Sequence, residues 1–248
     1  MTSWSDNNKE YKDACKEFIE NDAAFLEFRS YNGNYNIVVE HVRKIDADNY
    51  LAVIGRDNKH LLDKIELFKK NDLIGKPNLA DFGSLGKIST TTIRYIKVLS
   101  DIMRMRRCEE KGSIIEIGGG YGGQARILME FFTTTDYTMV DLAEVLPLQI
   151  KYLRMYGKEI CAVSPEMVKS ISRSYDFCVS NFAFNECSKE TQELYIDKII
   201  SKSKHGYISG VFTGVNGMSC DEVTGSIPGC IVRDYEPDIG FGCKIIEW

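Results

Sequence analysis

The second half of the sequence repeats a short apolar segment, a loop and an amphipathic segment, and this alternation constrains the fold more than any other feature. The apolar segments cover residues 113–117, 137–140, 159–163, 175–180 and 206–212, and patterns typical of helices lie between them. Alternating strands and helices predict a mostly parallel sheet with helices on both faces and right-handed crossovers. We therefore predict an α/β fold.

Two further apolar runs, residues 230–233 and 243–248, close the sequence with a short, turn-rich connection between them. Antiparallel neighbours need only a short connection, whereas parallel neighbours need a longer crossover. We predict that this pair forms an antiparallel hairpin at the edge of a seven-stranded sheet.

The earlier residues show helical periodicity instead. Apolar positions recur at helical spacing in residues 11–28 and 51–70. Glycines and a proline punctuate residues 71–87, which we expect to form a loop. Ser89 is a typical N-cap for a helix that we expect to run to about residue 107.

The length of 248 residues suits one large domain, or one domain with a smaller cap. We predict a helical N-terminal cap at residues 1–110, which shapes the substrate region, and a cofactor-binding sheet domain at residues 111–248.

Composition narrows the choice of partner and compartment. The 31 basic and 36 acidic residues give a net charge of −5, which argues against a nucleic-acid partner held by bulk charge. The sequence has no stretch of about 18 apolar residues that could span a membrane, and its polar start is unlike a signal peptide. Its eight cysteines include no Cys-x-x-Cys pair, so we expect reduced thiols rather than disulfides. We predict a cytoplasmic protein without a membrane partner, and the sequence leaves open a homo-oligomer.

A glycine-rich loop follows the first strand of the repeated pattern. Gly118, Gly120 and Gly123 match the spacing of a dinucleotide-binding fingerprint, and Asp141 follows the second strand about 20 residues later. A carboxylate there can accept hydrogen bonds from both ribose hydroxyls of an adenosine. The alternative is a solvated aspartate in a turn.

Two cofactors compete for this loop. A nicotinamide cofactor would bring its pyrophosphate to the start of the following helix, whereas S-adenosylmethionine would bring an ammonium and no phosphate. Glu116 stands two residues before Gly118. Its carboxylate suits the ammonium and would repel the pyrophosphate, so we favour S-adenosylmethionine.

These residues carry a resemblance to a known family. Glu116-Ile-Gly-Gly-Gly120 resembles the first motif of class I S-adenosylmethionine-dependent methyltransferases. Residues 88–95, 140–149 and 180–188 resemble the sugar O-methyltransferase family, and the likeness spans most of residues 30–248.

The resemblance implies a Rossmann-like fold and methyl transfer to a hydroxyl of a sugar used in surface or capsular polysaccharide. The acceptor would be a nucleotide-linked sugar, for example a GDP-linked heptose or deoxyhexose, or a free sugar. We expect the following residues to contact the cofactor: Glu116, Gly118, Gly120, Tyr121, Gln124, Asp141 and Leu142.

Methyl transfer to a hydroxyl needs a base that takes the proton as the oxygen attacks. We expect this base beyond the fourth strand and choose Glu186, with Asn181 and Asn185 positioning the methyl group or the sugar. The alternative role for Glu186 is a charge at the start of the following helix, although Ser188 is a better cap there.

Other candidate bases fit less well. His205 precedes the fifth strand and so lies at the wrong edge of the sheet, whereas His41 and Tyr31 belong to the cap and could fold over the site. Asp221 and Glu222 are the second choice, and as paired carboxylates they could also bind a divalent metal. We predict a metal-independent reaction.

Arg94 and Tyr95 are the expected substrate-binding residues of the cap. The Arg94 guanidinium could hold a diphosphate by paired hydrogen bonds, or could form a structural ion pair. Two other functions stay open at this point: an NAD-dependent oxidoreductase, and a cofactor-binding domain without turnover.

Overall fold

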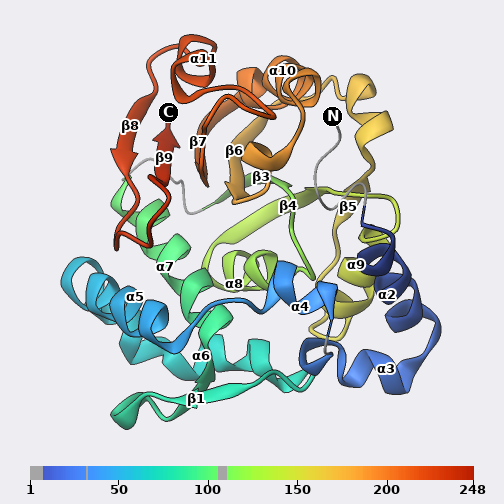
Figure 1. Ribbon diagram of the computed structural model, residues 1–248, viewed down its shortest axis with the longest axis vertical. Helices are drawn as coiled ribbons and strands as arrows, with labels where there is room; N and C mark the ends of the chain where they lie inside the picture. The colour runs from blue at the N-terminus through green and yellow to red at the C-terminus, as the bar shows by residue number, and fades with distance from the viewer. Residues whose placement is uncertain (1–7, 32, 106–110) are drawn as a thin grey trace.

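The computed structural model describes residues 8–31, 33–105 and 111–248. A seven-stranded sheet forms its centre, and helices cover both faces (Figure 1). The strands lie in the order β5–β4–β3–β6–β7–β9–β8. Their bounds are β3 Lys111–Ile117, β4 Thr133–Val140, β5 Cys161–Val163, β6 Tyr175–Asn181, β7 Ser203–Gly210, β8 Ile231–Asp234 and β9 Lys244–Glu247.

The five strands from β5 to β7 pair in parallel, and the last strand, β9, pairs antiparallel with both β7 and β8. The predicted α/β fold, with a mostly parallel seven-stranded sheet and an antiparallel C-terminal hairpin, is confirmed. The predicted strand at 159–163 is shorter than expected, because only Cys161–Val163 pairs with β4.

Ten helices are described along the chain. Their bounds are α2 Lys9–Glu20, α3 Asp22–Leu26, α4 Asn34–Val39, α5 Lys44–Asp57, α6 Ile65–Lys69, α7 Thr90–Arg104, α8 Gly123–Phe131, α9 Leu146–Arg154, α10 Lys189–Lys198 and α11 Cys220–Gly225. In Figure 1 the blue to teal N-terminal helices gather at the opposite end of the molecule from the orange α10 and the red α11.

Alternate residues of the central strand β3 face opposite sides of the sheet. Ile114 belongs to the hydrophobic core that the N-terminal helices share, whereas Ile115 and Ile117 belong to the core beneath α10 and α11. Because successive side chains of a strand point to opposite faces, Glu116 shares the face of Ile114. The strand therefore directs Glu116 toward the N-terminal helices.

The first part of the chain differs in detail from the prediction. Asn21 interrupts the helix expected at 11–28, because its side chain accepts hydrogen bonds from the backbone N–H of Ala23 and Ala24 and starts α3. Asn58 likewise ends α5 within the stretch 51–70, where its Nδ2 donates to the Ser100 carbonyl at 2.9 Å. Short polar side chains compete for backbone hydrogen bonds and so favour helix ends.

The loop expected at 71–87 contains a strand. β1 (Leu79–Asp81) pairs antiparallel with β2 (Lys87–Ser89) in a separate two-stranded sheet. Ser89 is the N-cap of α7 as predicted, since its Oγ accepts a hydrogen bond from the backbone N–H of Thr91 at 3.2 Å. The expected helix end at residue 107 and the expected boundary at residue 110 lie outside the described residues.

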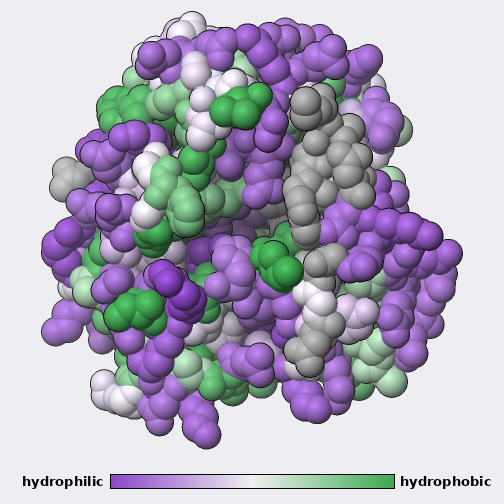
Figure 2. Space-filling model, in the orientation of Figure 1, coloured by the Kyte–Doolittle hydropathy of each residue, from purple (hydrophilic) through white to green (hydrophobic). Residues whose placement is uncertain are grey.

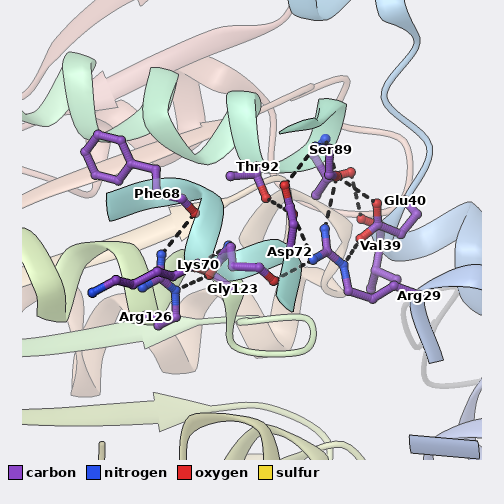
Figure 3. Close-up of polar contacts among 12 residues, drawn as sticks. Arg29, Val39, Glu40, Phe68, Lys70, Asp72, Ser89, Thr92, Gly123 and Arg126 are labelled. Atoms are coloured by element: carbon purple, nitrogen blue, oxygen red, sulfur yellow. Dashed lines mark hydrogen bonds and ion pairs between the residues drawn. The ribbon is translucent and has the colours of Figure 1, made fainter. Parts of the chain in front are cut away.

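A buried ionic network holds the N-terminal segments together (Figure 3). Arg29 is fully buried and forms ion pairs with Glu40, which directly follows α4, and with Asp72 at 3.0 Å. Its Nη2 also donates to the Ser89 Oγ at 3.0 Å. One guanidinium thus joins the end of α4 to the start of α7.

The same region is attached to the helix that follows the glycine loop. Asn71 donates from Nδ2 to the carbonyl of Gly123 at 3.2 Å, and Arg126 of α8 donates from Nε to the Asn71 Oδ1. Arg126 also donates to the Phe68 carbonyl at 3.2 Å (Figure 3). These bonds fix α8 against the segment between α6 and α7.

Candidate active site

A cavity of about 810 Å³ opens where the parallel strands β3, β4 and β6 end. In open α/β sheets, ligands bind beyond the carboxyl ends of the strands. On the face in Figure 2, polar side chains predominate, and the apolar ones form small separate groups. On this face the cavity, rather than an extended apolar surface, is therefore the candidate site.

The glycine loop forms one wall of the cavity, and its backbone needs glycine. Gly118 has φ +73°, and a Cβ built there would lie 2.1 Å from the Cβ of Ala183. Gly118, Gly119 and Gly120 all line the cavity. We call these glycines, together with Glu116, Gln124 and Asp141, the glycine end of the cavity.

Glu116 lies at the glycine end and is 1% exposed. Its Oε2 accepts a hydrogen bond from the Tyr137 hydroxyl at 2.7 Å, and its Oε1 has no hydrogen-bond partner within the described part of the chain. Burial raises the pKa of Glu116 to about 8. A cationic donor at Oε1 would satisfy the buried oxygen and stabilise the charged carboxylate.

Asp141 holds the glycine loop in place. Its Oδ2 accepts from the backbone N–H of Gly119 at 3.0 Å and from Nε2 of Gln149 at 2.6 Å. Gln149 also donates to the Gly120 carbonyl at 2.9 Å. The Asp141 carboxylate therefore lies against the loop on the cavity wall and shapes that wall.

Of the remaining residues predicted to contact the cofactor, one lines the cavity and two do not. Gln124 lines the cavity, donates from Nε2 to the Tyr95 carbonyl at 3.3 Å and has a buried, unpartnered Oε1. Tyr121 and Leu142 are not among the cavity-lining residues, and their contact with the cofactor stays a prediction. Tyr121 is fully buried against the rings of Phe28 and Tyr152, with centroids 5.4 and 5.0 Å away.

Glu186 also lines the cavity, from the short turn after β6. Burial raises its pKa to about 6, and the nearby Arg94 guanidinium opposes that shift. No side chain among the described residues hydrogen-bonds the Glu186 carboxylate, which is therefore available to a ligand. A partly buried carboxylate with a pKa near neutrality is suited to act as a general base.

The Arg94 guanidinium interacts electrostatically with Glu186 and contacts a second cavity-lining residue, His41. Arg94 donates from Nη1 to Nε2 of His41 at 3.1 Å, and the Nδ1 of His41 lies 3.1 Å from the Val38 carbonyl. Burial and the Arg94 charge lower the pKa of His41 to about 4. Both ring nitrogens of this neutral histidine are engaged, so His41 is a poor base.

We call His41, Tyr50, Arg94, Asn181, Phe182 and Glu186 the Glu186 end of the cavity. Asn181, expected just after the strand, is the last residue of β6, and its Oδ1 accepts a hydrogen bond from the Ser209 hydroxyl at 3.1 Å. Tyr95 also lines the cavity, between the two ends: both Arg94 and Glu116 affect its pKa, which burial raises.

Several predicted candidates do not reach the cavity. Asn185 is not among the cavity-lining residues, and its side chain packs beside Gly210. Asp221 and Glu222 are exposed on α11, where Glu222 forms a capping box with Ser219. The cap residue Tyr31 contacts Phe18 instead.

Two further expectations concern His205 and Ser188, which lie near β7 and α10. His205 pairs with Phe177 near the start of β7, away from the cavity as predicted. Ser188 is the N-cap of α10, where its Oγ accepts a hydrogen bond from the backbone N–H of Thr191 at 3.3 Å, so Glu186 is not needed as the cap.

Sequence reasoning missed the aromatic residues of the Glu186 end. Phe182 lines the cavity with φ +58°, a conformation that bulky residues rarely adopt and that gathers at functional sites. Tyr50 of α5 and Phe241 of the connection before β9 also line it, and Phe241 is 85% exposed. In the sequence, only the glycines on either side of Phe241 indicated an exposed turn at this position.

The comparisons with known proteins concern the fold. No protein-family model and no curated protein matches the chain. A protein of known structure from Thermoplasma acidophilum has a TM-score of 0.50 at 14% identity, over 75% of this chain and 95% of that chain.

Two structures described as methyltransferases lie at lower scores. The methyltransferase domain of the bacterial protein CtHen1 has a TM-score of 0.47 at 14% identity, over 62% of this chain and 96% of that chain. An rRNA methylase from Streptococcus thermophilus has a TM-score of 0.46 at 12% identity, over 60% and 92% of the two chains.

Two observations bear on metals and membranes. In residues 8–31, 33–105 and 111–248, no three His, Cys, Asp or Glu side chains are grouped so that they could hold a metal ion. No helix in the same ranges is long and apolar enough to cross a membrane.

Proposed function

We propose that the protein is an S-adenosylmethionine-dependent methyltransferase that methylates a hydroxyl of a sugar. The observation that carries the proposal is one cavity that joins the glycine end, with its unsatisfied buried Glu116 oxygen, to the unpartnered Glu186 carboxylate. A nucleoside cofactor and an acceptor must meet in such a space for methyl transfer.

The glycine end fits the cofactor. The Oε1 of Glu116 would accept a hydrogen bond from the cofactor ammonium, and Asp141 would accept from the ribose hydroxyls. When bound, S-adenosylmethionine supplies an electrophilic methyl group. A pyrophosphate would instead face the Asp141 carboxylate and would offer no cation to the unpartnered Glu116 oxygen, which disfavours an NAD-dependent oxidoreductase.

The Glu186 end supplies the base. Glu186 would take the proton of the acceptor hydroxyl, while Asn181 at the end of β6 would orient the acceptor. Proton transfer to a positioned base with a pKa near neutrality accelerates a reaction by about 10²- to 10⁴-fold.

The sugar acceptor rests on the sequence resemblance, and polar and aromatic lining residues support it. Tyr50 and Phe182 offer flat surfaces to a sugar ring, and Arg94 offers a cation to an anionic group such as the diphosphate of a nucleotide-linked heptose or deoxyhexose. The N-terminal cap, proposed as residues 1–110, contributes α4, α5 and α7 to the acceptor side.

A screen tests the proposal. Nucleotide sugars and free sugars are incubated with the protein and S-adenosylmethionine carrying a labelled methyl group, and products are read by mass spectrometry. We expect one sugar to gain the labelled methyl group. Binding of S-adenosylhomocysteine without transfer to any sugar would contradict the sugar assignment and favour a different acceptor or a binding domain without turnover.

A further inference from the structure

The charged residues of the cavity fall into two separate groups. At the glycine end, Asp141 is, within the part of the chain that the structure describes, the only charged residue that contributes to the raised pKa of Glu116. At the Glu186 end, Arg94 affects the pKa of both Glu186 and His41. The guanidinium therefore belongs to the part of the cavity where the acceptor would bind. This inference rests on the proposed function.

Arg94 is buried without an anionic partner. It is 7% exposed, and its Nε has no hydrogen-bond partner. Its polar contacts are to the neutral His41 ring and to the side chain of Tyr95, whose ring centroid lies 5.6 Å from the guanidinium carbon. Among the residues that the structure describes, no carboxylate forms an ion pair with it. A buried guanidinium in this state lacks the compensation that buried charges normally have.

The other fully buried arginines show how this fold satisfies a guanidinium. Arg29 has two carboxylates, Glu40 and Asp72, and also donates to the Asn71 carbonyl at 2.7 Å. Arg126 donates to Asn71 and to the carbonyls of residues 67 and 68. Arg29 thus has two carboxylates and Arg126 has three oxygen acceptors from the protein, although the Nη1 of Arg126 has no partner. Arg94 lines the cavity and interacts with the His41 ring and the Tyr95 side chain, but with no carboxylate in ion-pair contact among the described residues.

We propose that Arg94 binds an anionic oxygen group, a carboxylate or a phosphate, carried by the acceptor ring itself beside the hydroxyl that is methylated. The acceptor class is then an acidic sugar, such as a uronic acid or a sugar phosphate. A guanidinium recognises such groups by paired, charge-assisted hydrogen bonds.

The number of available charges favours one anionic group over a diphosphate. Arg43 is the other arginine on the cavity wall, and Asp46 already accepts two hydrogen bonds from it, both at 2.8 Å. Its side chain is also 71% exposed. Arg94 thus offers the cavity one buried cation that has no carboxylate in ion-pair contact among the described residues and that lies close enough to lower the pKa of Glu186.

The test compares three probes on the full-length protein saturated with S-adenosylhomocysteine. D-glucuronate, D-glucose 6-phosphate and D-glucose are titrated by ligand-observed NMR. We expect the matching anionic probe to bind at least about tenfold more tightly than glucose, and Arg94→Met to remove that preference. Arg104→Met, on the same helix but outside the cavity, is the matched control and should keep it.

The outcomes separate the sources of the anion. A preference for glucuronate assigns a carboxylate, and a preference for glucose 6-phosphate assigns a phosphate. Arg94→Lys retains the charge without the paired geometry and should keep part of the preference. This variant keeps the test informative if Arg94→Met melts at a much lower temperature than the wild-type protein.

Three results would overturn the proposal. Equal binding of all three probes would show that no anion is recognised. Weakening of GDP binding alone in Arg94→Met would assign the residue to a diphosphate, and a tenfold loss of S-adenosylhomocysteine affinity would assign it to the cofactor carboxylate. Failure of the wild-type protein to bind S-adenosylhomocysteine would instead count against the proposed function.

Discussion

The glycine end of the cavity comes from one stretch of the sequence, residues 116–141, whereas the Glu186 end combines the segment after α4, α5, α7, the end of β6 and the turn after it. Neighbouring parallel strands bring their carboxyl ends to one edge of the sheet, so the first end follows from strand order alone. The second end depends on how the N-terminal helices pack on that edge. The proposed cofactor site is thus set by topology, and the proposed acceptor site by packing.

Both ends contain a buried carboxyl group with a raised pKa, but their surroundings differ. The Glu116 carboxyl group accepts a hydrogen bond from the Tyr137 hydroxyl, and in the described ranges no cation lowers its pKa, which burial raises to about 8. The Glu186 carboxyl group has no side-chain hydrogen bond in those ranges, and the nearby Arg94 opposes the effect of burial, so that its pKa is about 6. The Glu116 carboxyl group is suited to bind a cationic ligand, and the Glu186 carboxyl group is suited to accept a proton.

The largest expected effect is at the Glu186 end. Glu186→Gln removes the proposed base, so kcat should fall by about 10²- to 10⁴-fold while the affinity for S-adenosylhomocysteine stays within about twofold. Steady-state kinetics and calorimetry measure the two quantities. Unchanged methyl transfer in this variant would exclude Glu186 as the base.

The pH profile sharpens the same prediction. Because burial raises the pKa of Glu186 to about 6, the carboxyl group gains a proton below that pH and can no longer act as a base. The wild-type rate should therefore fall by about tenfold for each pH unit below 6. A rate that stays constant from pH 7 to pH 5 would contradict the assignment.

The next largest effect is expected on cofactor affinity at the glycine end. Asp141→Ala should weaken S-adenosylhomocysteine binding by about 1.5–3 kcal/mol through lost charge-assisted hydrogen bonds. Because Asp141 also holds Gly119, the 2′-deoxy analogue serves as the control ligand. If Asp141 binds the ribose, the variant should lose most of its discrimination between the two ligands. Full retention of that discrimination would leave only the structural role.

A smaller effect concerns the protonation of Glu116. Its carboxyl group is largely protonated at pH 6 because burial raises its pKa to about 8, whereas an ammonium ligand favours the ionised form. The affinity for S-adenosylhomocysteine should therefore rise with pH, by about 20-fold from pH 6 to pH 7.5. Glu116→Gln should abolish this rise, and a rise of equal size in that variant would place the titrating group elsewhere.

The smallest effect is expected at the mouth of the cavity. Phe241 is 85% exposed, so Phe241→Ala removes only a partial contact with an acceptor. We expect the acceptor KM to rise by about threefold, with kcat and S-adenosylhomocysteine affinity unchanged. A loss of cofactor affinity here would show that the two ends are not separate.

The sequence predicts the sheet and the glycine end well for a physical reason. Strand-length apolar runs, glycines that a close turn requires and a carboxylate at a strand end are local patterns. The positions of Arg94 and Glu186 at the cavity also follow from local order, since each lies close to the end of a named element.

Other features could not be predicted because they depend on three-dimensional packing. Tyr121 lies inside the glycine loop, yet its ring turns into the aromatic core beneath it. Asn185 stands one residue before Glu186, yet packs beside Gly210. The hydrogen bond between Arg94 and His41 joins segments that are distant in the sequence. The positive φ of Phe182 belongs to a residue type that rarely adopts it, so no local pattern indicates it.

Isothermal titration of the full-length wild-type protein with S-adenosylhomocysteine and, separately, with NADH tests the central claim most directly. Glu116 and Asp141 at the glycine end predict that S-adenosylhomocysteine binds with a dissociation constant in the micromolar range and that NADH does not bind. Binding of NADH without binding of S-adenosylhomocysteine would contradict the proposed function.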